Sequence, residues 1–267
     1  MIAPALVQFR EAYARHRAGE GRGHSGRDLL ALPYLDHGPL ARQWAVRARS
    51  FDVFMRDLLR PEAERLDRQL AVLDLGAGNG WLSYRVAREG HMATAIDIRG
   101  DAIDGLGAAM PFVARAPNQL DCVIASFDAV PLDAASADVT VFNAALHYAT
   151  DFAATVAEAA RLTRPGGLIA ILDSPFYRRD RDGEAMVAEK HRQATGRFGD
   201  AAATLLGLPF IEYLTRDRLA DASAAAGLAW QRHRVRYPMW YELRPVIALL
   251  RSRRPPSRFD IWWARRP

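Results

Sequence analysis

The stretch VLDLGAGNGWLS, residues 72–83, runs an apolar segment into three alternate glycines. Such a run, followed by the amphipathic residues 80–89, is typical of a buried strand that turns tightly into a helix. Glycine permits the tight turn and lets the backbone approach a ligand closely. By itself the stretch is compatible with a nicotinamide site, a phosphate cradle or a site for another nucleotide-like cofactor.

Short apolar runs alternate with longer amphipathic segments from residue 70 onward, which is typical of a parallel sheet between helices. We therefore predict the α/β class, with a Rossmann-like sheet and helices on both faces. The expected strands are residues 69–75, 92–98, 121–127, 138–144, 167–174, 229–236 and 258–265. The expected helices are residues 80–89, 101–110, 151–163 and 216–226, with a further helix within 241–253.

The length of 267 residues, half of them hydrophobic, favours one elaborated domain over residues 1–267. Two regions interrupt the alternation, and they divide the chain into four parts. The expected parts are an N-terminal helical cap (1–68), a cofactor-binding core (69–175), a helical insertion or lid after the fifth strand (176–214) and the C-terminal part of the sheet (215–267).

The composition excludes several classes of function. The formal charge of +5 is modest, and its excess comes from arginine because Lys190 is the only lysine, so we do not expect a nucleic-acid partner. The basic segment 251–258 fits a solvated loop. No run of about 18 apolar residues predicts a membrane span, and the N-terminus lacks a secretory pattern, so we expect a cytoplasmic protein, either monomer or homodimer.

Cys122 is the only cysteine, which excludes internal disulfides and a zinc site built from cysteines. We accordingly expect no metal. Because Cys122 lies in the apolar run DCVIA, we expect a buried side chain.

Three aspartates narrow the choice of ligand. Asp74 precedes the glycines, where a carboxylate would repel a pyrophosphate but could attract or orient an ammonium group. Asp97 ends the next strand, where a carboxylate can accept both ribose hydroxyls, and Asp128 ends the third, within reach of an adenine amine. Together they describe a ligand with an amino group, a ribose and an adenine, and without phosphate.

At this point the chain resembles the class I S-adenosylmethionine-dependent methyltransferases of the small-molecule type 11 group. The resemblance rests on LDLGAGNG (73–80), AIDI (95–98), SFDAVPLDAASADVTVFNAALHY (126–148) and RLTRPGGLIAI (161–171), in the family's order. It implies a seven-stranded sheet whose seventh strand is antiparallel beside the fifth, and S-adenosylmethionine as cofactor.

The resemblance also implies roles for individual residues. The glycine loop would wrap the methionine moiety with Gly76, Ala77, Gly78 and Asn79, and Asp74 would orient that loop. Asp97 would hold the ribose, Ile98 would pack against the adenine, and Phe127 with Asp128 would frame it. Asn143 and Ala144 would lie near the sulfonium.

Methyl transfer from a sulfonium is an in-line displacement, to which holding the reactants together can contribute roughly 7–11 kcal/mol. His147 is a candidate general base, because it follows the fourth strand and an ordinary histidine titrates near neutral pH. Tyr148 could line the acceptor pocket. One arginine of the N-terminal cap, Arg42, Arg47 or Arg49, could meet the cofactor carboxylate.

The acceptor is expected to be a small molecule, apolar or aromatic, because aromatic side chains gather in regions near the expected opening. They are Tyr177, Tyr237, Trp240 and Tyr241. Three alternatives stay open: an RNA methyltransferase, a nicotinamide oxidoreductase, and a non-catalytic protein that binds the cofactor. Asp74 and the missing third glycine of GxGxxG argue against the nicotinamide site.

Overall fold

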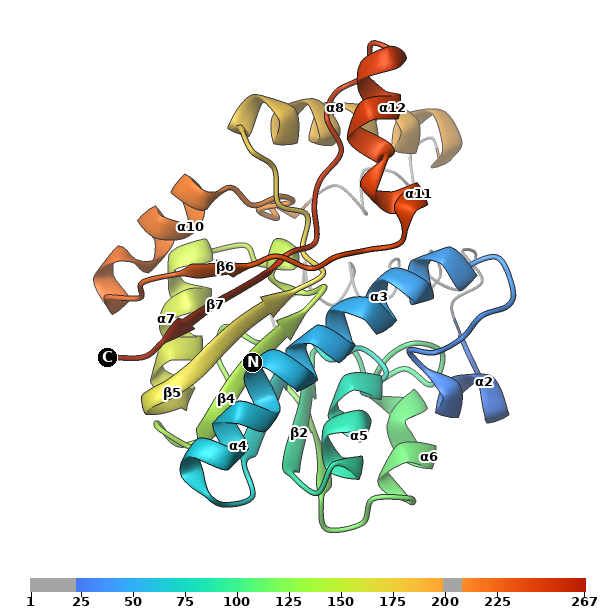
Figure 1. Ribbon diagram of the computed structural model, residues 1–267. Helices are drawn as coiled ribbons and strands as arrows, with labels where there is room; N and C mark the ends of the chain where they lie inside the picture. Colours follow the sequence, from blue (N-terminus) through green and yellow to red (C-terminus); the bar gives the residue numbers. More distant parts are fainter. Residues whose placement is uncertain (1–22, 199–207) are drawn as a thin grey trace.

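The computed structural model describes residues 23–198 and 208–267, with a seven-stranded sheet at the centre (Figure 1). The strand order is β3-β2-β1-β4-β5-β7-β6. The strands are β1 (Ala71–Leu75), β2 (Met92–Asp97), β3 (Leu120–Ile124), β4 (Ala137–Asn143), β5 (Thr163–Leu172), β6 (Gln231–His233) and β7 (Ile261–Arg265). The first five strands pair in parallel, and β7 pairs antiparallel with both β5 and β6. The predicted fold class is thereby confirmed.

Alternate residues of the strands face two separate hydrophobic clusters, as expected for a sheet buried on both faces. On one face Val72, Val139 and Ala170 pack with the helices α3 to α6. On the other face Leu73, Phe142 and neighbouring residues pack with α7 and α10. The helices of these two layers are α3 (Ala41–Phe54), α4 (Arg60–Leu66), α5 (Trp81–Arg88), α6 (Met110–Val113), α7 (Phe152–Leu162) and α10 (Arg216–Ser223).

A short π-helical turn, η1 (Met55–Leu59), joins α3 to α4, so that one long helical segment runs across the front of the sheet (Figure 1). The short helix α2 (Gly26–Ala31) precedes it. Within the predicted N-terminal cap, residues 26–31 and 41–66 are helical, and residues 1–22 lie outside the described part of the chain.

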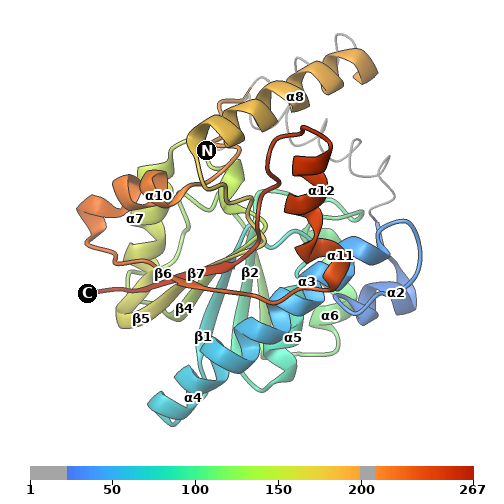
Figure 2. The ribbon, with the colours of Figure 1, turned by 45° about the horizontal axis from the view of Figure 1, so that its top comes forward.

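Three further helices follow β5 in the sequence: α8 (Asp180–Phe198), α11 (Met239–Glu242) and α12 (Arg244–Leu250). Figures 1 and 2 show α8 and α12 on the same side of the molecule, with α11 beside the N-terminal half of α3. The contact between α11 and α3 includes Arg42, whose guanidinium lies over the Trp240 ring, 5.7 Å from its centroid. Within the described residues, no helix has the length and apolar character that a membrane span needs.

The predicted helix at 101–110 is wrong over its first half. Asp101 accepts hydrogen bonds from the backbone amides of Ile103 and Asp104, which holds a turn in place of a helix. Helical structure begins only at a 3₁₀ turn, η2 (Leu106–Ala109), and continues into α6.

The prediction of a buried Cys122 is also wrong, because its side chain is exposed. It lies on β3, which is an edge strand, and the central residues of that strand are exposed or half-buried.

Candidate active site

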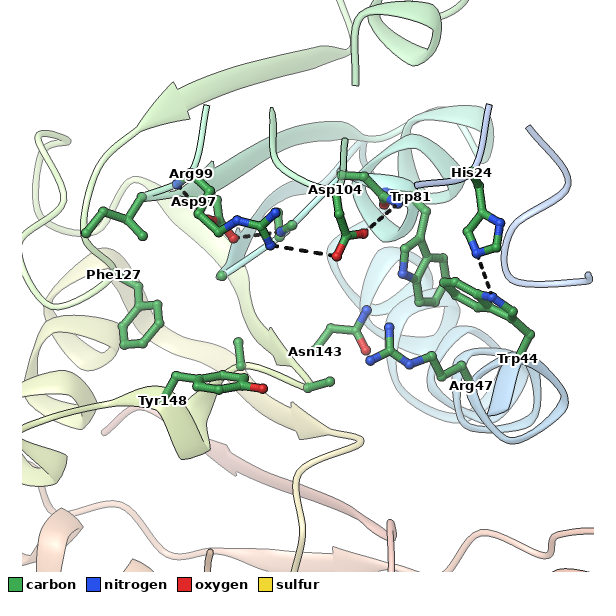
Figure 3. Close-up of a pocket in the computed structure, with 17 residues that line it drawn as sticks. His24, Trp44, Arg47, Trp81, Asp97, Arg99, Asp104, Phe127, Asn143 and Tyr148 are labelled. Atoms are coloured by element: carbon green, nitrogen blue, oxygen red, sulfur yellow. Dashed lines mark hydrogen bonds and ion pairs between the residues drawn. The ribbon is translucent and has the colours of Figure 1, made fainter. Parts of the chain in front are cut away.

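A cavity opens at the carboxyl ends of β1, β2 and β4, beside the centre of the sheet (Figure 3). From β1 the chain builds one half of the sheet through β2 and β3, and it then crosses to β4 and β5 on the other side. Ligands of open α/β sheets bind at such a switch point. The cavity has a volume of about 120 Å³ and opens to solvent at its mouth.

The glycine loop between β1 and α5 forms one wall of the cavity. Gly76, Gly78 and Gly80 all have left-handed backbone conformations, with φ of 79°, 58° and 75°. A Cβ on Gly76 would stand 2.4 Å from the Cβ of Ala145, so no other residue fits there without displacement of its neighbours. The amides of Gly76 and Ala77 both donate to the Ile96 carbonyl, which ties the loop to β2.

Asp97, at the end of β2, supports the same loop. One carboxylate oxygen accepts the Gly78 amide at 2.7 Å and the other accepts the Arg99 amide at 2.8 Å. Burial raises the pKa of Asp97, while these two amides act in the opposite direction. Because each carboxylate oxygen has a second lone pair, Asp97 can still accept hydrogen bonds from a ligand in the cavity.

Asn143 and Ala144 lie at the end of β4 and line the cavity, as does Tyr148. Ala144 has a φ of 55°, which is rare for a residue other than glycine and is typical of strained positions at functional sites. Asn143 is 8% exposed, and its Oδ1 atom has no hydrogen-bond partner among the described residues. A buried amide oxygen at a cavity wall is therefore available to a ligand donor.

The helix α3 supplies the wall opposite the strands. Figure 3 shows Trp44 and Arg47 on this helix, with the Arg47 guanidinium directed toward Asn143. Among the three arginines predicted to meet the cofactor, only Arg47 lines this cavity. Arg42 lies against Trp240, and Arg49 donates to the Arg236 carbonyl, 2.9 Å away.

Several lining residues were not singled out from the sequence. Trp44 packs edge-on against Trp81, and its indole donates to His24. Arg99 is buried and forms an ion pair with Asp101 at 2.8 Å, with Asp104 further away at 3.7 Å. A sequence signal existed for two of the missed residues, because Trp81 directly follows the glycine loop and Arg99 closely follows Asp97. The missed residues are His24, Trp44, Trp81, Arg99, Asp104 and Ala145.

Ten of the predicted site residues line this cavity, as expected from the sequence. Their individual roles stay predictions. The ten residues are Gly76, Ala77, Gly78, Asn79, Asp97, Ile98, Phe127, Asn143, Ala144 and Tyr148. Three others lie outside this lining, as the described residues form it: Asp74, Asp128 and His147.

Asp74 is buried inside β1 rather than exposed to the cavity. It accepts a hydrogen bond from the Ser83 hydroxyl of α5 at 2.9 Å. Burial, with a smaller contribution from the Asp97 charge, raises the pKa of Asp74 to about 7. This position fits a group that holds the glycine loop between β1 and α5, which is the role predicted for Asp74.

Asp128 is half-buried beside the lining residue Phe127. His147 lies behind Tyr148, with its ring centroid 4.2 Å from the Tyr148 ring, and its backbone carbonyl accepts the Glu212 amide. The tyrosine and not the histidine therefore reaches the cavity.

Comparison with known proteins bears on the identity of this site. Residues 73–171, which include the glycine loop, Asp97 and Asn143, match the family described as a methyltransferase domain. An uncharacterized methyltransferase of Mycobacterium tuberculosis is 30% identical over 181 residues, which make up 63% of this chain and 67% of that protein. A malonyl-[acyl-carrier protein] O-methyltransferase of Erwinia pyrifoliae is 33% identical over 52% of this chain and 46% of its own length.

Among solved structures, geranyl diphosphate C-methyltransferase from Streptomyces coelicolor aligns with a TM-score of 0.59 at 16% identity, over 97% of this chain and 98% of that one. A putative sarcosine dimethylglycine methyltransferase from Galdieria sulphuraria aligns with a TM-score of 0.55 at 15% identity, over 95% and 96% of the two chains. At these identities the likeness concerns the fold. Taken with the sequence matches, it identifies the chain as a member of the methyltransferase domain family, the S-adenosylmethionine-dependent methyltransferases that its motifs resemble.

Proposed function

We propose that the protein transfers a methyl group from S-adenosylmethionine to a small-molecule acceptor, with the cofactor in the cavity at the carboxyl ends of β1, β2 and β4. The observation that carries this proposal is the junction of the glycine loop and Asp97. Gly76 lines the cavity at a point where a Cβ would clash with Ala145, and Asp97 fixes the loop through the Gly78 amide.

The residues present fit the cofactor chemically. Asp97, Ile98 and Phe127 line the cavity, where Asp97 would accept the ribose hydroxyls and the apolar side chains of Ile98 and Phe127 would cover the adenine. The Oδ1 of Asn143, which has no hydrogen-bond partner among the described residues, would accept a hydrogen bond from the ammonium group, and Arg47 would bind the carboxylate through a charge-assisted bond.

When bound, S-adenosylmethionine supplies a methyl group on a positively charged sulfur. The chain's own contribution is to hold the acceptor in line with that methyl group and to exclude water. Trp44 and Trp81 form a rigid aromatic wall, because their rings pack edge-on with centroids 6.0 Å apart. Tyr148 lines the cavity and packs perpendicular to the ring of Phe210, with the centroids 5.6 Å apart.

The general-base role of His147 stays a prediction. Its support is weaker than that for the cofactor residues, because the ring lies behind Tyr148 and outside the cavity lining formed by the described residues. Positioning of the reactants is therefore the main source of rate enhancement in this proposal.

The alternative of an RNA acceptor has less support in the structure. Two arginines of the basic segment 251–258 are already paired: Arg254 with Glu189 and Arg258 with Glu242 and Asp260. A nicotinamide oxidoreductase does not agree with the family of the chain. RNA binding that weakens steeply as the salt concentration rises would favour the RNA alternative.

A transfer assay tests the proposal. The full chain is incubated with S-adenosylmethionine carrying a tritiated methyl group and a library of small molecules, and with total RNA in parallel. We expect label to enter at least one small molecule and not the RNA. Label that enters only RNA would contradict the proposed acceptor class. So would label that enters neither the small molecules nor the RNA, provided that a known methyltransferase run in parallel labels its own substrate.

A further inference from the structure

A second cavity lies beside the first, and the Arg47 side chain lines both. This second cavity has a volume of about 240 Å³ and is open to solvent. It is bounded by α3 on one side and by the end of β5, α11 and the segment before β7 on the other. A molecule bound here and a cofactor bound in the first cavity would both lie against Arg47.

Among the described residues that line this second cavity, Asp173 is the acidic one. Asn143, at the end of β4, pairs with Leu172 on the neighbouring strand β5. Asp173 directly follows Leu172, and neighbouring strands lie about 4.8 Å apart, so Asp173 lies close to the proposed cofactor site. Its φ of 50° marks a second strained position next to that of Ala144. Both strands thus end in left-handed residues where the two cavities meet.

The Asp173 carboxylate is only half satisfied. Its Oδ1 atom accepts the Ser50 hydroxyl of α3 at 2.6 Å. Its Oδ2 atom is buried and has no hydrogen-bond partner among the described residues. Because an unpartnered buried carboxylate oxygen is costly, its presence at a cavity wall indicates a ligand that donates a hydrogen bond or a proton.

The other walls are aromatic: Trp240, Tyr241 and Phe259 line the cavity. Two arginines lie over aromatic faces in the same region, Arg42 over Trp240 and Arg244 over Tyr241, and Arg244 also donates to the Tyr241 and Ser257 carbonyls. These arginines are therefore used in packing and backbone contacts. The surface suits a neutral aromatic body better than an anion.

We propose that the second cavity receives the methyl acceptor, a neutral aromatic alcohol or amine, and that Asp173 accepts the proton it loses. The acceptor's oxygen or nitrogen forms a bond to the methyl carbon, and the C–S bond breaks with its electron pair on sulfur. The proton passes to Oδ2 of Asp173 and then to water. This inference rests on the proposed methyl transfer and adds the acceptor class and a catalytic residue.

The ionisation of Asp173 agrees with this role. Burial raises its pKa to about 6, while Arg47 and the Ser50 hydroxyl lower it. The other titratable or charged groups that face it are Tyr237, Tyr241, Arg42 and Arg244. A carboxyl with this pKa is ionised at neutral pH and still a useful base, so kcat/KM should rise with pH through about 6.

The probes are 4-ethylphenol, 4-ethylaniline and 4-ethylanisole, the last of which has no O–H or N–H group. Calorimetry measures their binding to the full chain saturated with S-adenosylhomocysteine, and a tritium assay measures methyl transfer. We expect methylation of the phenol or the aniline and not of the anisole. Asp173→Asn should lower kcat at least about 100-fold, remove the pH dependence and leave the affinity for S-adenosylhomocysteine within threefold.

A matched pair of variants tests the cavity independently of Asp173. Trp240→Ala should weaken probe binding about fivefold or more, while Met239→Ala, a 70% exposed neighbour on the same helix, should not change it. The inference would be overturned if Asp173→Asn kept the wild-type kcat, or if the wild-type pH profile were flat between pH 5 and 8. It would also be overturned if the two α11 variants bound the probes with equal affinity, or if none of the probes were methylated. Failure of the wild type to bind S-adenosylhomocysteine would instead overturn the proposed function.

Discussion

Asp74 in β1 and Asp97 in the adjacent strand β2 have different surroundings, which indicate different roles. Asp97 lines the cavity and accepts two backbone amides, whereas Asp74 is enclosed between β1 and α5. The sequence could predict both positions, because each follows from a motif. It could not predict Asp173, because the significance of that residue depends on Ser50 and Trp240, which come from distant helices.

The raised pKa of Asp74 predicts a pH-dependent effect on stability. A carboxyl whose pKa is about 7 when folded, against 3.8 ordinarily, binds its proton more tightly in the native state. Its burial therefore lowers the free energy of unfolding as pH rises from about 4 to 7. Asp74→Asn removes this loss, so it should raise the free energy of unfolding at pH 8 by about 2 kcal/mol and have little effect at pH 4.

Urea unfolding of the wild type and Asp74→Asn at the two pH values measures this difference. Asp121→Asn, which changes an exposed carboxylate on β3, is the control. An equal effect of Asp74→Asn at pH 4 and pH 8 would show that its carboxyl is not protonated preferentially in the folded protein.

Arg47 gives a second prediction at this scale. Because a charge-assisted hydrogen bond contributes about 1.5–3 kcal/mol, Arg47→Gln should weaken binding of S-adenosylhomocysteine about 10- to 100-fold. Arg49→Gln should leave the affinity unchanged, because the Arg49 side chain donates to Arg236 and lines a different surface. Calorimetric titration of both variants decides the matter, and equal affinities would exclude Arg47 as the carboxylate ligand.

At the scale of elements, the alternation of apolar and amphipathic segments predicted all seven strands, and the resemblance to the methyltransferase family implied that the seventh lies antiparallel beside the fifth. The prediction failed at 101–110, where Gly105 and Gly107 pack so closely that added Cβ atoms would stand 2.7 Å from Asp101 Oδ2 and from the Gly100 carbonyl. Side-chain hydrogen bonds and close backbone packing there outweigh the helical pattern. Such effects depend on tertiary contacts and leave little trace in periodicity.

The glycine loop predicts a contrast between two alanine substitutions. Gly76→Ala combines a left-handed backbone with a Cβ 2.4 Å from that of Ala145, so it should lower stability by more than 2 kcal/mol and abolish binding of S-adenosylhomocysteine. Gly90 also has a left-handed backbone, with a φ of 92°, but a Cβ added there would have no atom within 4 Å. Gly90→Ala should cost about 1–2 kcal/mol and leave binding intact. Thermal unfolding and calorimetry on both variants measure the contrast, which equal effects would contradict.

At the scale of the whole molecule, charged pairs join segments far apart in the sequence. Asp138, at the start of β4, is fully buried and pairs with Arg68 before β1 and Arg164 in β5. Glu62 of α4 similarly pairs with Arg265 of β7. The placement of α3 across the cavity depends on this kind of long-range packing, which explains why the sequence left three arginines as candidates for one contact.

The Asp138 pair predicts a loss of stability without a loss of binding. Asp138→Ala would leave Arg68 and Arg164 without their partner, which should lower the free energy of unfolding by about 3 kcal/mol. The site at the other end of β4 should still bind S-adenosylhomocysteine at 15 °C. Denaturant unfolding measures the first effect and calorimetry the second, and lost affinity in a folded variant would contradict this separation.

The most direct test of the cofactor site is calorimetric titration of S-adenosylhomocysteine into the wild type, Asp97→Ala and the control Asp121→Ala. Asp97 accepts the ribose hydroxyls in this account, whereas Asp121 is exposed on β3. We expect the wild type and Asp121→Ala to bind with equal affinity, and a folded Asp97→Ala variant to bind at least about 100-fold more weakly. Undiminished affinity of Asp97→Ala, or no binding to the wild type, would contradict this expectation.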